Sequence, residues 1–159
     1  MIVSTPDWVK HSNDKHKSTP IYSLHVHPSS TYLVTGGQDF KIKVWSMLPL
    51  LDQAAEDSSP KLMSTLVMHT GAVLAVRWSP DGEMLASGSD DTKIIIWAPD
   101  ASNFGGFGVK NLIGYRAIHV LTGHESDVVD LAWTPDHLAS CGLDCKVNIW
   151  HASSFGIFN

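Results

Sequence analysis

Groups of aspartate, histidine and serine recur along this chain with spacings that could support hydrolysis. In that chemistry an aspartate orients a histidine, and the histidine takes a proton from a nucleophilic serine. The grouping occurs twice, each time with a tryptophan, as His69, Ser87, Asp91 and Trp97 and as His124, Ser140, Asp144 and Trp150. The sequence has no G-x-S-x-G nucleophile motif. Recurrence with the same tryptophan favours a structural repeat over several active sites, so we expect no enzyme activity.

The tryptophans mark the period of this repeat. Trp45, Trp97 and Trp150 lie 52 and 53 residues apart. Each follows an aspartate by six residues and a serine or threonine by ten. The aligned segments are "TGGQDFKIKVW" (35–45), "SGSDDTKIIIW" (87–97) and "SCGLDCKVNIW" (140–150). A period of this length is typical of proteins built from stacked repeats.

The four side chain types can form one closed hydrogen-bond chain. An indole N–H, a hydroxyl, an imidazole and a carboxylate each find a partner, so the group can be buried at tolerable cost. The first unit supplies Thr35, Asp39 and Trp45. The histidine nearest to the expected position is His16, which lies one residue further from Pro28 than His69 and His124 lie from their prolines. We therefore expect a partial and looser network in the first unit.

Around these groups the sequence predicts an all-β fold with three strands per unit. The first strand ends at Pro28, Pro80 or Pro135, where proline suits a turn. The third is apolar, most plainly in "IIIW" (94–97), which indicates burial on both faces. Fourth strands are predicted at 62–68 and 117–121, and a short strand at 2–9. The predicted units cover residues 18–47, 69–98 and 124–151, within one partial domain spanning 1–159.

Two insertions follow the third strands of the first two units. They comprise residues 46–61, which are acidic, and 98–115, which are glycine-rich. Both are expected on the same face, where insertions in repeat proteins often bind partners. Tolerated surface loops are an equal alternative.

Composition narrows the function classes. The chain has 159 residues and a net charge of −5, which argues against nonspecific nucleic-acid binding. Its start lacks the basic and apolar regions of a signal peptide, and no apolar run could cross a membrane. Two cysteines do not make a disulfide scaffold. We expect no cofactor and no direct binding to nucleic acid or membrane.

Four residues of types that bind metals lie within fifteen residues of each other: His137, Cys141, Cys145 and His151. Thiolates and imidazoles are zinc ligands. The repeat alignment nevertheless places these residues on different strands and turns, so it predicts no tetrahedral site.

The strand plan and the tetrad spacing resemble the WD40 repeat, the four-stranded blade of a β-propeller. The "GH" of that motif is present only as Gly123-His124, and Ser46, Ala98 and His151 replace the final aspartate. Three units are too few to close a ring. We expect an open ring with about three of seven blades, as the N-terminal piece of a longer protein. The strand at 2–9 would belong to the missing last blade.

The resemblance extends to one family. "WVKH", "LVTGGQDFKIKVWSMLPLL", "MHTGAVLAVRWSPDGEMLASGSDDTKIIIW" and "HESDVVDLAWTPDHLASCGLDCKVNIWHASSF" are similar to the start of the HIRA/Hir histone chaperones. This resemblance implies a nuclear protein-interaction scaffold in replication-independent nucleosome assembly and transcriptional repression. Its partners would be other subunits of a Hir-type complex and, indirectly, core histones. The alternatives are the WD40 subunit of chromatin assembly factor one and a WD40 adaptor unrelated to chromatin.

Overall fold

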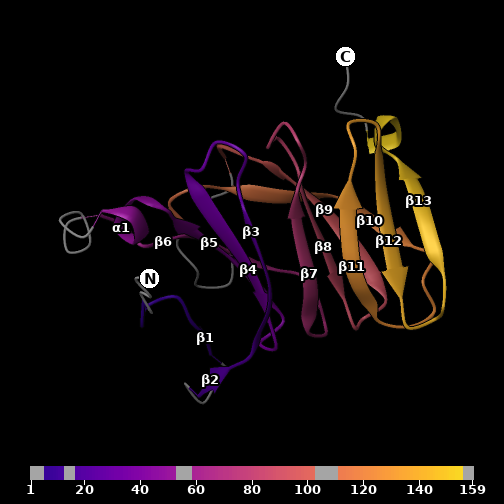
Figure 1. Ribbon diagram of the computed structural model, residues 1–159, viewed down its shortest axis with the longest axis horizontal. Helices are drawn as coiled ribbons and strands as arrows, with labels where there is room; N and C mark the ends of the chain where they lie inside the picture. Colours follow the sequence, from indigo (N-terminus) through magenta and orange to yellow (C-terminus); the bar gives the residue numbers. More distant parts are fainter. Residues whose placement is uncertain (1–5, 13–16, 53–58, 103–110, 156–159) are drawn as a thin grey trace, which may run out of the picture.

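The computed structural model describes residues 6–12, 17–52, 59–102 and 111–155, and within them it consists of antiparallel β-sheets (Figure 1). A small sheet near the N-terminus pairs β1 (His11–Ser12) with β2 (Ser18–Thr19). The other described strands form three larger sheets that stand side by side across the molecule (Figure 1). The predicted all-β class is confirmed.

Each of the three larger sheets is one blade. The first blade contains β3 (Ile21–Val26), β4 (Tyr32–Gly37), β5 (Lys41–Ser46) and β6 (Leu62–Val67), in that order across the sheet. The second contains β7 (Val73–Trp78), β8 (Leu85–Ser89), β9 (Lys93–Pro99) and β10 (Tyr115–Thr122). The third contains β11 (Val128–Trp133), β12 (His137–Gly142) and β13 (Val147–His151).

The central strands of the second blade are buried because sheets cover both of their faces. Ile94, Ile95 and Ile96 are at most 1% exposed. Ile95 belongs to the apolar cluster shared with the first blade, whereas Ile94 and Ile96 belong to the cluster shared with the third. An uninterrupted apolar run is therefore the sequence pattern of a strand between stacked sheets.

Where two blades pack together, the first strand of one blade, called here its inner strand, lies on the face of the preceding blade. β7 contacts β3, β4 and β5, and β11 contacts β7 and β8. At the first junction Val73 lies against Gly36, where an added Cβ would come within 2.6 Å of the Val73 Cγ1. Val128 lies against Gly88 in the same way, at 2.7 Å. Glycine is needed at both positions because any side chain would collide with the valine of the next blade.

The segments after the third strands differ among the blades. A short helix, α1 (Leu48–Leu51), follows β5. After β9, the described end of the second insertion returns to the first blade, where the backbone N–H groups of Leu112 and Ile113 donate to the Met63 carbonyl. A 3-10 helix at Ala152–Phe155 follows β13. The central parts of both insertions, 53–58 and 103–110, lie outside the described residues.

The N-terminal segment departs from the predicted strand at 2–9. Residues 1–5 lie outside the described part of the chain, and residues 6–10 form a turn and irregular backbone. Extended pairing starts only at His11, because the neighbour there is β2.

Candidate functional site

The second blade brings its four predicted network residues together. The Trp97 indole Nε1–H donates to the Ser87 Oγ over 2.9 Å, and the Ser87 Oγ lies 2.8 Å from the His69 Nε2. The His69 Nδ1 lies 2.9 Å from the Asp91 carboxylate. A neutral imidazole with its proton on Nδ1 satisfies both bonds, since Nε2 then accepts the serine proton.

The third blade repeats this geometry. The Trp150 Nε1–H donates to the Ser140 Oγ over 2.9 Å. The Ser140 Oγ lies 2.8 Å from the His124 Nε2, and the His124 Nδ1 lies 2.8 Å from the Asp144 carboxylate. In both cases the histidine lies two residues after the last strand of the preceding blade, β6 or β10. The serine and the tryptophan lie on two neighbouring strands, and the aspartate lies in the turn between those strands.

The first blade also has a full network, and its histidine is His11. The His11 Nε2 lies 2.8 Å from the Thr35 Oγ1, and its Nδ1 lies 2.5 Å from the Asp39 carboxylate. The Trp45 Nε1–H donates to the same hydroxyl over 2.8 Å. The expectation of a partial, looser network was therefore wrong. His16 lies outside the described residues.

The first blade differs because the segment between its histidine, His11, and its inner strand, β3, is longer than in the other blades. His11 begins β1, and β2 follows before β3 starts, so counting back from Pro28 misses the histidine. A signal was present in the sequence, because "VKHS" (9–12) matches "VMHT" (67–70). In both, the residue after the histidine donates its backbone N–H to the aspartate, over 3.2 Å from Ser12 and 2.9 Å from Thr70.

The aspartates remain ionised because several N–H groups point at them. Desolvation acts to raise the pKa of Asp144, but the Glu125 backbone N–H, the His124 ring and the Lys146 backbone N–H lower it to about 2. The pKa of Asp91 is also lowered: desolvation opposes this shift, while bonds from Thr70, His69 and Lys93 outweigh it. Burial lowers the pKa of His69 despite its aspartate neighbour. A neutral histidine beside an ionised carboxylate fits the tautomer above.

Each network aspartate also shapes the turn that follows it. Each carboxylate accepts the backbone N–H two residues further on, from Lys41, Lys93 and Lys146 respectively. In Asp91 and Asp144 the accepting oxygen is the one that does not face the histidine, whereas in Asp39 the same oxygen also faces His11. The residue between has a positive φ in every case: 67° at Phe40, 69° at Thr92 and 62° at Cys145. The aspartate therefore holds a left-handed turn even where no glycine is present.

This arrangement can position strands but cannot present a nucleophile. The hydroxyl residues Thr35, Ser87 and Ser140 are at most 2% exposed. Each hydroxyl oxygen already lies within bonding distance of an indole and an imidazole. A substrate therefore has no path to these oxygens in this conformation. The networks are built for stability.

The four clustered residues of zinc-ligand type are spread over the third blade. His137 and His151 are cross-strand neighbours with ring centroids 4.7 Å apart. Cys145 is exposed in the turn after Asp144, and Cys141 lies in β12. No cluster of three or more histidine, cysteine, aspartate or glutamate residues suited to a metal occurs in the described part of the chain. Nor does that part include a helix long and apolar enough to cross a membrane.

One polar connection joins the inner strands of all three blades. Arg77 donates from Nη1 to the Ser23 Oγ over 2.9 Å and from Nη2 to the Asp130 carboxylate over 2.6 Å. The Trp133 indole donates to the Arg77 carbonyl over 3.0 Å. The His25 Nδ1 accepts the Trp78 backbone N–H over 2.9 Å, and burial, Arg77 and His27 lower the His25 pKa.

Repeated antiparallel sheets with an Asp–His–Ser/Thr–Trp network in each define a WD40 β-propeller. Two solved structures of similar fold agree: "Structure of U3-55K" and "Crystal structure of RRP9 WD40 repeats" each match with a TM-score of 0.66 and 24% identity. The match covers 86% of this chain in both cases, and 37% and 36% of the respective neighbour. At this identity the likeness shows the fold alone.

A family model described as the CAF1B/HIR1 beta-propeller domain matches residues 1–154. The chain belongs to this CAF1B/HIR1 β-propeller family. HIR1 of Cryptococcus neoformans is 48% identical over 98% of this chain and 18% of its own length. HIR1 of Mycosarcoma maydis is 48% identical over 98% and 16%, and the HIRA homolog of Drosophila melanogaster is 40% identical over 94% and 15%. The chain thus spans less than a fifth of these relatives.

Proposed function

We propose that this chain is the N-terminal WD40 scaffold portion of a HIRA/Hir-type histone chaperone subunit. In this role it acts in the nucleus through protein–protein contacts, within a complex that assembles nucleosomes independently of replication and represses transcription. Its partners are other subunits of that complex and, indirectly, core histones. It performs no catalysis of its own.

The match to the family over residues 1–154 is the observation that carries this proposal. The blade geometry supports the scaffold role, because the groups with catalytic residue types are buried in structural networks. The net charge of −5 also fits contact with proteins better than contact with nucleic acid.

The family description also contains the WD40 subunit of chromatin assembly factor one, which is the second candidate. The relatives favour the first, since HIR1 and HIRA proteins match nearly the whole chain at 40–48% identity. The two candidates predict different partners. A Hir-type subunit joins a replication-independent complex, whereas the other joins a replication-coupled one.

The test is affinity purification of the tagged chain from nuclear extract, followed by mass spectrometry. Recovery of Hir-complex subunits with core histones is expected. The double variant Asp91→Ala/Asp144→Ala serves as the control, because it weakens two blades without touching the outer surface, and it should lose these partners. Recovery of chromatin assembly factor subunits instead would support the second candidate. Recovery of no chromatin protein would overturn both.

A further inference from the structure

The turns that follow the inner strands of the first and second blades meet through one imidazole. The His27 ring packs against the Trp78 ring at an interplanar angle of 75°, with the ring centroids 4.8 Å apart. The His27 Nε2 lies 3.0 Å from the Gly82 carbonyl oxygen, and Trp78 is only 2% exposed. At this first junction, a side chain from one turn therefore fills the space beside the tryptophan of the next inner strand.

The second junction, between the second and third blades, has the same tryptophan but lacks the ring. Trp133 holds the repeat position of Trp78, and Ser79 holds that of His27. The Ser79 hydroxyl is bound within its own turn, where it accepts the Met84 backbone N–H over 2.9 Å. Because serine is small and bound in this way, the place of the imidazole is left unfilled.

The turn after the inner strand is also shorter in the third blade. In the second and third blades one backbone hydrogen bond closes this turn. The bond spans the six residues of "SPDGEM" (79–84) but only the four of "TPDH" (134–137). The third blade therefore has no counterpart of Gly82, and the second junction lacks the carbonyl that the His27 ring meets at the first.

A cavity of about 200 Å³ occupies this place between the second and third blades. The two turns that enclose it follow β7 and β11 and lie at the same end of the two blades (Figure 1). Its apolar walls are formed by Met84, the half-buried Trp133, Pro80 and Pro135. Of the described residues that line the cavity, Asp81 and Asp136 alone are charged. The cavity thus combines an aromatic wall with two carboxylates.

Both carboxylates can accept a cation. The Asp136 carboxylate makes no hydrogen bond or ion pair within the described part of the chain. In Asp81, Oδ1 accepts the Ser79 hydroxyl over 2.5 Å and the Glu83 backbone N–H over 2.9 Å, which leaves Oδ2 for a ligand. Desolvation acts to raise the pKa of Asp81, but these two bonds lower it, so the carboxylate stays ionised at neutral pH.

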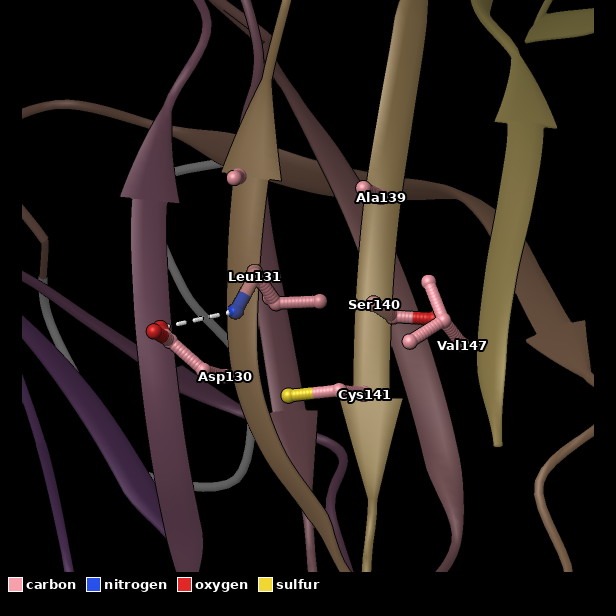
Figure 2. A pocket seen from close by; sticks show the side chains of 7 residues that line it. Asp130, Leu131, Ala139, Ser140, Cys141 and Val147 are labelled. Atoms are coloured by element: carbon pink, nitrogen blue, oxygen red, sulfur yellow. Dashed lines mark hydrogen bonds between the residues drawn. The ribbon is translucent and has the colours of Figure 1, made fainter. Parts of the chain in front are cut away.

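The charged side chains of the neighbouring inner strands are already paired. Asp130 on β11 accepts the Leu131 backbone N–H over 2.8 Å (Figure 2) and the Arg77 guanidinium over 2.6 Å. Among the described residues, no lysine, arginine or histidine lines the cavity. The positive charge that suits its two carboxylates therefore comes from outside the described residues.

We propose that this cavity binds an arginine side chain of a partner protein, with the guanidinium packed against Trp133 and paired with Asp81 and Asp136. A guanidinium is planar, like the imidazole that occupies the first junction, and it packs favourably on an indole and pairs with carboxylates. Lysine shares the charge but not the planar shape. This inference concerns one surface of the chain and stands independently of the chromatin function.

The first measurement is a nuclear magnetic resonance titration of the isotope-labelled chain with a capped glycine pentapeptide that has one arginine at its centre. The Trp133 indole N–H resonance, which Trp133→Phe identifies by its loss, should shift and saturate at millimolar peptide. The same peptide with citrulline has the shape of arginine without the charge and should bind at least about threefold more weakly. Equal binding of the two peptides, or no shift of this resonance, would overturn the proposal.

The second measurement repeats the titration with two variants that each lose one negative charge. Asp136→Asn should weaken arginine binding by about threefold or more, because it removes a carboxylate from the cavity. Glu83→Gln is the matched control, since Glu83 is exposed in the turn of Asp81 but does not line the cavity, and its affinity should be unchanged. Equal weakening by the two variants would show a general attraction to an acidic surface and would contradict a defined site.

The comparison with the first junction is tested by Ser79→His. This variant supplies the ring that His27 supplies there, so it should fill the cavity and abolish binding while the circular dichroism of the folded protein is retained. Unchanged binding by the folded variant would overturn the assignment. If Ser79→His does not fold, the result for Asp136→Asn decides, because that substitution removes no side-chain bond within the described residues.

Discussion

The chemistry of individual side chains explains why an apparently catalytic grouping is structural. Aspartate, histidine and serine are arranged as in a hydrolase, but the serine oxygen accepts a tryptophan indole N–H and is buried. Each donor of this network is paired, which is the condition for placing so many polar atoms between sheets. Removing any one member leaves its neighbours unpaired.

Loss of a network aspartate should therefore cost stability. Asp91→Ala removes the acceptor for His69 and for the Thr70 N–H, and we expect a loss of about 1–3 kcal/mol in the free energy of unfolding. Urea denaturation followed by tryptophan fluorescence measures it. Asp90→Ala is the control, since Asp90 is exposed and lies next to it in sequence. Equal unfolding midpoints for the two variants would contradict the role of the network.

Acid should weaken the fold in two stages. His69 has a folded pKa below 6.5, so the unfolded chain binds its proton first and stability declines as the pH falls below that value. Asp91 and Asp144 have folded pKa values below 3.8, with Asp144 at about 2. Their contribution is present above 3.8 and is lost as the pH falls from there toward 2. Urea midpoints measured across this range should decline in both stages, and the lower decline should be smaller in Asp91→Asn. A flat profile would contradict the assignment.

The residues of two networks were predictable from spacing alone because their outer and inner strands are joined by short, similar connections. His69 and His124 each lie eleven residues before the proline that ends an inner strand. His11 was not found, because β1 and β2 lengthen the same connection in the first blade. A fixed count fails where an insertion occurs, whereas the local match of "VKHS" to "VMHT" does not depend on it.

At the scale of strands and turns, the strands were predictable from the sequence, whereas the conformation of the turns was not. The β-type runs ended by prolines and the apolar third strands predicted the strands of each blade, because each pattern reflects a defined burial in the stack. The left-handed turn residues were not predictable, since Phe40, Thr92 and Cys145 are not residue types that favour positive φ. The aspartate before each one holds the turn, and that effect is visible only in the structure.

Relief of this strain should stabilise a turn. Thr92 is β-branched and has a φ of 69°, so Thr92→Gly should raise the free energy of unfolding, by up to about 1 kcal/mol after the entropic cost of glycine. Thermal and urea unfolding give the value. Thr70→Gly, at an exposed site without this backbone conformation, should not stabilise the protein. A lower stability for Thr92→Gly would show that the turn is not strained.

The close packing between blades can be tested at Gly88, against which Val128 of the next blade packs. Gly88→Ala places a Cβ about 2.7 Å from the Val128 Cγ1, and such overpacking costs on the order of 1–3 kcal/mol. Val128→Ala removes the opposing methyl groups, so the alanine at position 88 should cost less in that background. A double-mutant cycle in urea measures the difference. Strictly additive effects of the two substitutions on the free energy of unfolding would contradict a direct contact between residues 88 and 128.

The three blades form one packed unit for two reasons. The inner strands of the second and third blades pack on the blade before them. In addition, the Arg77 side chain hydrogen-bonds to residues of the first and third blades. The sequence predicted this stack from its period, since a repeat that cannot bury its own faces must bury them against its neighbours. It could not predict the polar contacts of Arg77, which follow no repeat: His25 and Ala132 hold the same position in the other blades. The stacking of the blades thus follows from the sequence repeat, whereas the polar contacts of Arg77 do not.

The most direct test of this account is the tautomer of the three network histidines, read from the ring-nitrogen resonances at slightly alkaline pH. The structure predicts that His11, His69 and His124 are neutral with the proton on Nδ1, each held between a carboxylate and a hydroxyl. Three matching histidines would show the same closed network in all three blades, including the first. A proton on Nε2 in any of them would place an unprotonated Nδ1 against the aspartate carboxylate, where neither atom can donate, and would contradict the common architecture of the blades.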